Sequence, residues 1–274
     1  MKLSIVLSTQ PAQFQAATFK GDLEANLTRI AGLGYDGVEL AIRDPKLVDY
    51  AELERLTRAH HLSVPAIGTG QAWGEEGLSF TDPDESVRKA AVQRIKSHFP
   101  GAARFGAAVI LGLIRGQVKP GVDPAQAMDW LVAAIRDCAR VAGQLGVRLA
   151  LEPINRYETT LINSSAQGLE LVERVGADNF GLLLDTFHMN IEEPSIEASL
   201  WECGQHIYHF HVADSNRHAP GGGHLDFQSI LETLFATGYR GWLSGEFLPR
   251  PDAETAARQG LAHLLQLQAL KRQA

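Results

Sequence analysis

The feature that most constrains the fold is a repeated alternation of two kinds of segment along the chain. Short apolar runs rich in β-branched residues are each followed by a longer stretch in which apolar residues recur at helical spacing. The apolar runs cover residues 3–7, 37–41, 63–67, 107–111, 148–152, 180–185, 207–211 and 241–246. Alternating strands and helices predict a parallel sheet, and eight such units predict closure of that sheet into a barrel.

The helical stretches and the chain length agree with a barrel of this kind. The stretches cover residues 22–32, 49–61, 84–105, 124–145, 165–175, a short piece near 196, 227–236 and 253–271. A barrel of eight strand–helix units needs roughly 250 residues, and the chain has 274. Because no linker or low-complexity segment interrupts the pattern, we expect an α/β protein that is a single (β/α)8 TIM barrel domain over residues 1–274.

An open, doubly wound sheet is the alternative arrangement of alternating strands and helices. A sheet of that type that binds a dinucleotide carries a glycine-rich turn after its first strand. In this chain the first strand is followed by Ser-Thr-Gln-Pro at residues 8–11, which contains no glycine. The barrel is therefore the preferred prediction.

Composition and charge restrict the partners and the compartment. The net charge of −7 argues against a general affinity for nucleic acid, which needs a basic surface. No apolar run approaches the roughly 18 residues that would cross a membrane, and the N-terminus lacks the long apolar region of a signal peptide. Cys138 and Cys203 form no CxxC pair, so we expect free thiols. These features predict a cytoplasmic protein without nucleic-acid or membrane partners.

Four polar residues stand at the C-terminal ends of successive predicted strands in the second half of the chain. They are Glu152, Asp185, His211 and Glu246. Each lies about one strand–helix unit from the next, so neighbouring strands deliver them to the rim where TIM-barrel active sites lie. Carboxylates and an imidazole suit Mn²⁺, Mg²⁺ or Co²⁺, and zinc also accepts such ligands although thiolates are absent here. We therefore expect a divalent metal site, with Mn²⁺ as the first choice.

Two arginines also follow predicted strands at this rim. Arg43 comes after the second strand and Arg115 after the fourth. Guanidinium groups bind carboxylates and phosphates through paired hydrogen bonds, and they also form ordinary surface ion pairs. If either arginine faces the pocket, a keto-sugar acid is favoured over a neutral ketose. We expect Arg115 to bind a substrate carboxylate.

Several motifs resemble the family of D-tagatose 3-epimerase and D-allulose 3-epimerase, which belongs to the xylose-isomerase-like barrels. The motifs are LEPINRYE at 151–158, LDTFHMNIEE at 184–193, HFHVADSNR at 209–217 and GEF at 245–247. Three shorter segments are similar to the branch that acts on 5-keto-L-gluconate. They are AIRDP at 41–45, IGTGQA at 67–72 and GLIRG at 112–116.

The resemblance implies a role for each residue of these motifs. Glu152 and Glu246 would be both metal ligands and the paired acid and base, with Asp185 and His211 completing the coordination. His188, which we expect in a loop, and Arg217 would hold substrate oxygens near the carbonyl. Glu158 would orient Glu152 or the substrate. A homodimer or homotetramer is also implied, because both are common in that family.

The implied reaction is inversion of a carbon beside a carbonyl in a ketose or keto-sugar acid. A proton must leave that carbon on one face and return on the other, which two opposed carboxylates achieve. Glu152 and Glu246 lie three predicted strands apart, so they can flank a substrate over the barrel centre. A divalent ion would act as the Lewis acid that stabilises the cis-enediolate.

Three other functions stay open at this point. A hydroxypyruvate isomerase or another aldose–ketose isomerase uses a similar barrel and glutamate pair, and the Glu-Pro-Ile-Asn segment at 152–155 fits it. An abasic-site endonuclease of the same superfamily would need histidine ligands on early strands, whose ends offer only Glu39, Gly68 and Gly112. A non-catalytic sugar-binding barrel would not need an intact set of acids and ligands.

Overall fold

The computed structural model describes residues 1–273, and its strands form one nine-stranded, parallel sheet. Eight strands follow one another around a ring, which the pairing of β9 with β1 closes. In ring order they are β1 (Lys2–Ser8), β3 (Gly37–Ala41), β4 (Ala66–Gly68), β5 (Ala108–Leu111), β6 (Leu149–Leu151), β7 (Phe180–Asp185), β8 (Ile207–Val212) and β9 (Trp242–Gly245). The short β2 (Phe19–Lys20) pairs with the C-terminal end of β1, at Leu7 and Ser8. The predicted (β/α)8 barrel is confirmed.

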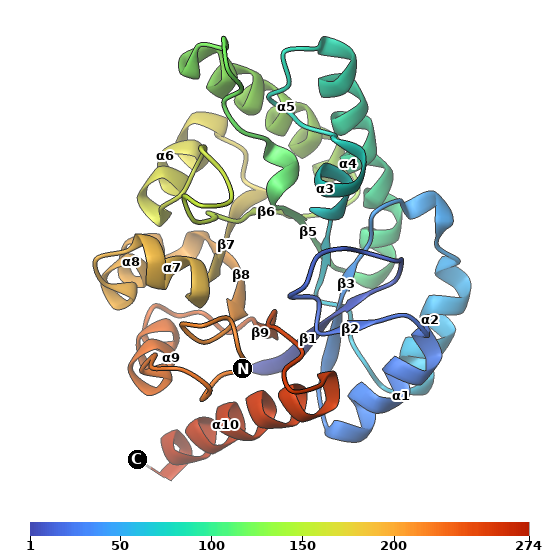
Figure 1. The fold of residues 1–274 in the computed structure, drawn as a ribbon, viewed down its shortest axis with the longest axis vertical. Coiled ribbons are helices and arrows are strands. Elements are labelled where there is room, and N and C mark those ends of the chain that lie inside the picture. Colours follow the sequence, from blue (N-terminus) through green and yellow to red (C-terminus); the bar gives the residue numbers. More distant parts are fainter. Residues whose placement is uncertain (274) are drawn as a thin grey trace.

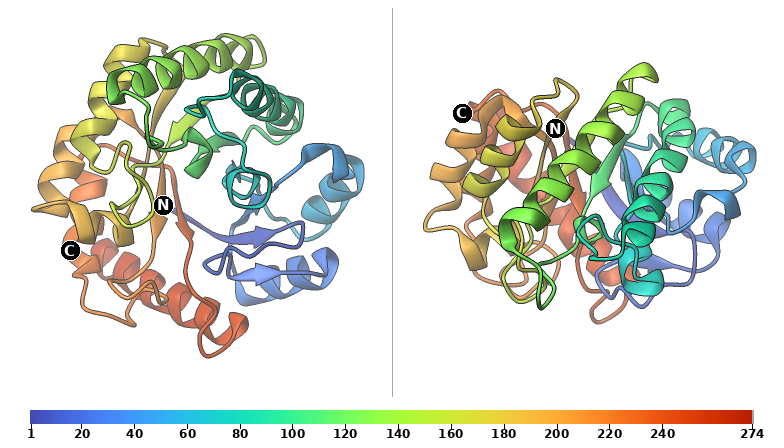
Figure 2. Two further views of the ribbon diagram at one scale, coloured as in Figure 1. Left: turned by 45° about the horizontal axis from the view of Figure 1, so that its top comes forward. Right: turned by 90° about the horizontal axis from the view of Figure 1, so that it is seen from above.

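Helices surround the ring on its outside (Figures 1 and 2). Those that follow the eight strands are α1 (Leu23–Leu33), α2 (Tyr50–Ala59), α4 (Glu85–Phe105), α5 (Pro124–Gln144), α6 (Ser165–Val175), α8 (Ile196–Cys203), α9 (Phe227–Ala236) and α10 (Ala253–Gln273). Two further short helices, α3 (Gln71–Glu76) and α7 (Thr186–Glu192), come directly after β4 and β7 and were not predicted. Within residues 1–273, no helix is both long and apolar enough to span a bilayer.

Aspartate side chains start many of these helices. The carboxylates of Asp22, Asp49, Asp84 and Asp123 each accept a hydrogen bond from a backbone N–H in the first turn of α1, α2, α4 and α5. Such caps satisfy donors that have no partner inside the helix. The helix boundaries therefore follow from local sequence, which is why the predicted ranges agree closely with the observed ones.

Alternate residues of the strands face two different environments. One set packs against the helices and belongs to the large core between the sheet and the helix ring. The other set faces the barrel interior and forms a separate small cluster of Ala66, Ala108, Ile110, Ala150 and Leu183. Most of these inward side chains are short, which leaves room above them for larger polar side chains at the C-terminal ends of the strands.

Candidate active site

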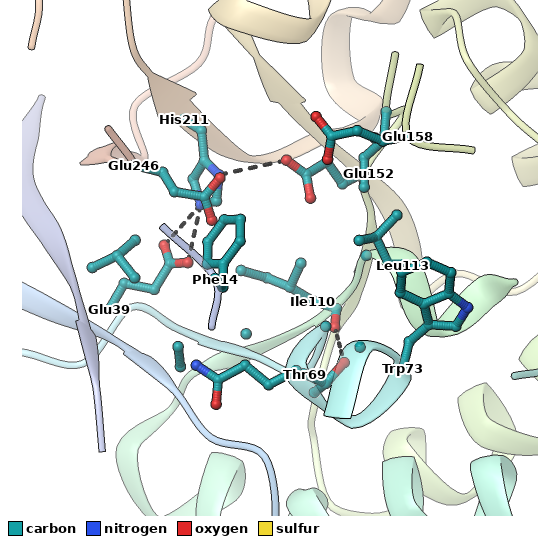
Figure 3. Close-up of a pocket in the computed structure, with 18 of the residues that line it drawn as sticks. Phe14, Glu39, Thr69, Trp73, Ile110, Leu113, Glu152, Glu158, His211 and Glu246 are labelled. Carbon is teal, nitrogen blue, oxygen red and sulfur yellow. Dashed lines mark hydrogen bonds and ion pairs between the residues drawn. The ribbon is translucent and has the colours of Figure 1, made fainter. Parts of the chain in front are cut away.

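The four predicted ligands come together at the C-terminal rim of the barrel, and Figure 3 shows three of them, Glu152, His211 and Glu246. Asp185 ends β7, His211 lies in β8, and Glu152 and Glu246 follow β6 and β9 directly. All four are buried, and their candidate donor atoms lie within 4.8 Å of one another. His211 Nδ1 is 3.7 Å from Glu152 Oε1 and 3.8 Å from both Asp185 Oδ2 and Glu246 Oε2. Four successive strands thus aim one oxygen or nitrogen each at a common point.

Three of these donor atoms have no hydrogen-bond partner among the residues that the structure describes. They are Glu152 Oε1, Asp185 Oδ2 and His211 Nδ1. Buried polar atoms without a partner are costly and rare in folded proteins. Because these atoms converge, and because carboxylates and imidazole suit a divalent cation, the four side chains fit a metal ion.

The local charges make Glu246 an unusually weak acid. Burial raises the pKa of Glu246 to about 8, with His211 and Arg217 opposing the rise and Glu152 and Asp185 adding to it. In the absence of an ion, this carboxyl therefore retains its proton around neutral pH. A carboxyl that can hold or release a proton near pH 7 is suited to acid–base catalysis.

His188 lies beside these ligands, on helix α7 and not in the predicted loop. Asp185 caps α7 by accepting a hydrogen bond from the N–H of Phe187, and this turns the chain into a helix directly after β7. His188 Nε2 is 3.7 Å from Glu152 Oε1. On the other side of the ring, His188 Nδ1 is 2.8 Å from the side-chain nitrogen of Asn155. Burial lowers the pKa of His188, so its imidazole is neutral near pH 7.

Arg217 connects two of the acids at the rim. One guanidinium nitrogen is 3.1 Å from Glu158 Oε1, and another is 3.0 Å from Glu246 Oε2. The guanidinium also lies over the rings of Phe14 and Phe187, at 5.5 and 4.7 Å from their centroids. These contacts hold the guanidinium group of Arg217 beside Glu246, where it faces the cavity.

Glu39 and His209 are site residues that the sequence interpretation missed. Glu39 lies on β3, is fully buried and lines the same cavity as the four ligands. Its carboxylate oxygens are hydrogen-bonded to Nε2 of His209 at 2.7 Å and to Nε2 of His211 at 3.0 Å. Although burial opposes ionisation, these two histidines lower the pKa of Glu39 well below its usual range. The missed signals were an acid inside an apolar strand and two histidines spaced by two on one strand face.

The cavity above these side chains has a volume of about 300 Å³ and two different ends. One end holds the cluster of acids and His211, with Glu158 and Arg217 beside it. The other end is mostly apolar, as Figure 3 shows for Leu113 and Trp73. Gly112 also lines the cavity, and a Cβ at this position would be 3.4 Å from Glu152 Oε2. The cavity therefore offers a polar reaction end and an apolar end for the rest of a ligand.

The structure does not bring Arg115 into this cavity, which corrects the prediction that it binds a substrate carboxylate. Arg115 is completely buried below the loop that follows β6. Its guanidinium donates hydrogen bonds to the backbone carbonyls of Glu152, Leu161 and Ile162. With its donors used in this way and no exposed surface, Arg115 is unable to reach a ligand and instead holds this loop in place.

Arg43 is also directed away from the cavity. Its Nε is 3.5 Å from Glu76 Oε1 at the end of α3, and Arg43 does not line the pocket. The surface ion pair, which was the alternative for this residue, is the arrangement found. Among the described residues that line the cavity, Arg217 is the single arginine or lysine.

Comparisons with known proteins place this geometry in context. A model of the family described as xylose isomerase-like TIM barrel matches residues 27–267. The L-ribulose 3-epimerase of Mesorhizobium japonicum is 32% identical over 235 residues, which cover 85% of this chain and 78% of the relative. The 3-dehydro-D-guloside 4-epimerase of Escherichia coli is 28% identical over 261 residues, or 90% and 96% of the two chains. A solved structure of an L-ribulose 3-epimerase is 27% identical, with a TM-score of 0.84 and coverage of 99% of this chain and 96% of that one.

Proposed function

The chain belongs to the xylose isomerase-like TIM barrel family, and from this premise we propose that it is a divalent-metal-dependent epimerase that inverts C3 of a ketose or keto-sugar acid. Its family and its relatives make it an enzyme of the isomerase class. The resemblance to ketose 3-epimerases is thereby confirmed, whereas the likeness to the 5-keto-L-gluconate branch stays a prediction. The proposal concerns the reaction, the ion and the roles of individual residues.

One observation carries the proposal: two glutamates from well-separated strands converge on one buried point. Glu152 follows β6 and Glu246 follows β9, with β7 and β8 between them in the ring. Both also belong to the group of side chains that fits a divalent ion. A substrate seated over this point would have one carboxylate near each face of the reacting carbon, which is what inversion beside a carbonyl requires.

We assign the two proton transfers to the side chains of Glu152 and Glu246. One glutamate removes the proton from C3, and the carboxyl of the other returns a proton on the opposite face. Glu152, Asp185, His211 and Glu246 would hold the ion, which supplies Lewis-acid stabilisation of the negative charge that develops on the substrate oxygens.

The neighbouring residues orient the reacting groups. Arg217 fixes Glu246 by donating a 3.0 Å hydrogen bond to its carboxyl group, and presents a positive charge to the polar end of the cavity. Neutral His188 can donate a hydrogen bond from Nε2 to a substrate oxygen, since Asn155 and the backbone of the β6–α6 loop occupy the Nδ1 side. Glu158 accepts hydrogen bonds from both Asn155 and Arg217, and so holds these groups together.

A neutral ketose would carry a hydroxyl group at the end far from the reacting carbon, whereas a keto-sugar acid would carry a carboxylate there. The residues that line the cavity bear on which of the two it can hold. Arg217 is already paired with two glutamates, so a distal carboxylate would have to be held by neutral donors such as the side-chain amides of Gln13 and Gln71, which line the cavity. The apolar surface of Trp73 and Leu113 suits the carbon face of a sugar. The experiment below therefore includes substrates of both kinds.

A deuterium-exchange screen tests the proposed reaction. The protein is loaded with Mn²⁺, incubated in D₂O with neutral ketoses, ketose phosphates and keto-sugar acids, freed of Mn²⁺ and read by NMR. We expect deuterium at C3 together with the C3 epimer in one of these classes. Exchange only at C1, with formation of an aldose, would instead identify an aldose–ketose isomerase. A Glu152→Gln, Glu246→Gln double variant, purified in the same way, controls for contaminating enzymes.

A further inference from the structure

Glu39, His209 and His211 form a hydrogen-bonded triad across the barrel interior. Glu39 Oε2 is 2.7 Å from His209 Nε2, and both Glu39 oxygens are 3.0 Å from His211 Nε2. All three side chains are buried. Strands β3 and β8 are not neighbours in the ring, since β1 and β9 lie between them. The triad is therefore a contact through the barrel centre and not part of a strand pairing.

This contact determines which nitrogen of His211 is free. A neutral imidazole carries one N–H donor and one lone pair, and a carboxylate can only accept. Because Glu39 accepts at Nε2, the proton of neutral His211 lies on Nε2 and the lone pair on Nδ1. Nδ1 is the atom that points towards Glu152, Asp185 and Glu246 and has no hydrogen-bond partner among the described residues.

His209 in turn fixes the carboxylate of Glu39. His209 and His211 are two residues apart on β8, so their side chains lie on the same face of the strand. Their rings meet edge to face, with centroids 5.4 Å apart. Two imidazole donors from one strand thereby hydrogen-bond to the carboxylate of Glu39. They limit its rotation and keep both of its oxygens beside His211.

We propose that Glu39 and His209 are positioning residues that set the tautomer and orientation of His211 for binding of a divalent ion. The inference rests on the proposed function in one respect, namely that His211 is a ligand of that ion. Hydrogen bonds from a carboxylate to the remote nitrogen of a ligating histidine raise affinity for a metal, and their loss typically costs 10- to 100-fold. Glu39 thus contributes to the ion site from the opposite side of the barrel.

The same three side chains could alternatively hold an ion of their own, since they are also close enough to act as a ligand group. In that case His211 would bridge two ions through its two nitrogens. The hydrogen bonds at 2.7 and 3.0 Å already give every oxygen of Glu39 a partner, and this favours the positioning role. The number of ions bound per chain separates the two cases.

Cobalt titration tests the proposal directly. Purified ion-free protein is titrated with Co²⁺, and the visible absorption gives both affinity and stoichiometry. The wild type should bind one ion per chain, and Glu39→Gln and His209→Phe should bind it about 10- to 100-fold more weakly. Glu39→Asp, which keeps the charge, should recover part of the affinity. Exposed Glu173 provides the matched control, with Glu173→Gln expected to bind as the wild type does.

Nitrogen NMR of the histidine rings gives a readout that a general loss of stability would not produce. In ion-free wild type, at a pH where the imidazole is neutral, His211 should be the tautomer with its proton on Nε2, and Glu39→Gln should shift that ring towards a mixture. Unchanged affinity and tautomer in Glu39→Gln and His209→Phe, or two ions per wild-type chain, would overturn the inference. If the wild type binds one ion but inverts no sugar, the proposed reaction fails while the role of Glu39 stands.

Discussion

The two halves of the barrel place different residues at the catalytic rim. The later strands β6, β7, β8 and β9 end in or beside charged and ligating side chains, namely Glu152, Asp185, His211 and Glu246. The earlier strands β1, β3, β4 and β5 end in or beside small residues, namely Ser8, Ala41, Gly68 and Gly112. In the proposed function, the later half therefore carries the chemistry, and the earlier half provides space and an apolar wall for the ligand.

The small residues of the earlier half serve the later half. Gly112 leaves the space next to Glu152 open, because a Cβ there would lie 3.4 Å from Oε2 of that glutamate. Glu39 is the exception among the early strands, and it too acts on the later half through His209 and His211. The strand–helix units thus repeat evenly around the ring, whereas the ligating side chains are concentrated in its later half.

The largest effect should come from the acids of the later half. Glu152→Gln and Glu246→Gln each remove a proton carrier while keeping the size of the side chain. We expect kcat to fall by about 10²- to 10⁴-fold, the range that general acid–base catalysis supplies. The measurement is epimer formation by NMR with saturating Mn²⁺. Activity within a few-fold of the wild type in either variant would contradict the division of labour between the two halves.

The two arginines Arg217 and Arg115 offer a matched comparison with smaller expected effects. Arg217 contacts acids at the cavity, whereas the guanidinium of Arg115 donates hydrogen bonds to backbone carbonyls. Arg217→Met should lower kcat by roughly 10²- to 10³-fold, as expected for loss of one electrostatic contact to the reacting groups. Its thermal midpoint should change little.

Arg115→Met should show the opposite pattern, because this residue holds the loop after β6. Its thermal midpoint should fall by several degrees, since carbonyls in a buried region lose their donor. Its remaining activity per folded molecule should exceed that of Arg217→Met. Equal losses of kcat in both variants, at a temperature where both are folded, would show that the two arginines are not divided in this way.

Ion binding should depend on pH through Glu246. Its pKa of about 8 lies above the ordinary value of 4.5, so the ion-free fold holds a proton there between these values. An ion must displace that proton, so the part of its apparent affinity that depends on Glu246 should rise by up to about tenfold per pH unit until pH 8 and then level off. The same proton favours the ion-free fold, whose stability should lose this contribution as pH rises from 4.5 through 8. Glu246→Gln should remove this component of both slopes.

The smallest effect should come from the apolar wall of the earlier half. Trp73→Ala removes a ring that lines the cavity away from the acids. We expect KM to rise roughly tenfold with kcat nearly unchanged, because this contact is equal in ground and transition states. Steady-state kinetics on the substrate found in the exchange screen measures this split. A large fall in kcat would mean that the wall takes part in positioning the reacting carbon.

Sequence alone predicted what local pattern determines. The strand and helix ranges follow from apolar periodicity and from capping residues such as Asp84, and the four ligands follow from their place at strand ends. Helix α7 was missed because seven residues are too few to show a helical period. Asp185 caps the first turn of this helix, so His188 lies on a helix and not in the predicted loop.

The remaining errors concern contacts that only the closed ring creates. Arg115 was expected in the cavity, but the 3₁₀ turn at Leu113–Arg115 directs it to backbone carbonyls that are 46 and 47 residues further along the chain. Glu39 reaches His211 across the barrel centre, over a separation of 172 residues. A pattern within one strand gives no distance between two strands, so neither contact could be read from spacing.

The central claim is that Glu152 and Glu246 transfer protons on opposite faces of one carbon, and isotope distribution tests it most directly. The enzyme is run in D₂O for less than one-tenth of the conversion to equilibrium, and C3 of both epimers is examined by NMR. Two opposed proton carriers should give a product fully deuterated at C3 and a recovered substrate that still carries hydrogen there. A product that retains the original hydrogen would instead show that a single group moves the proton between the two faces.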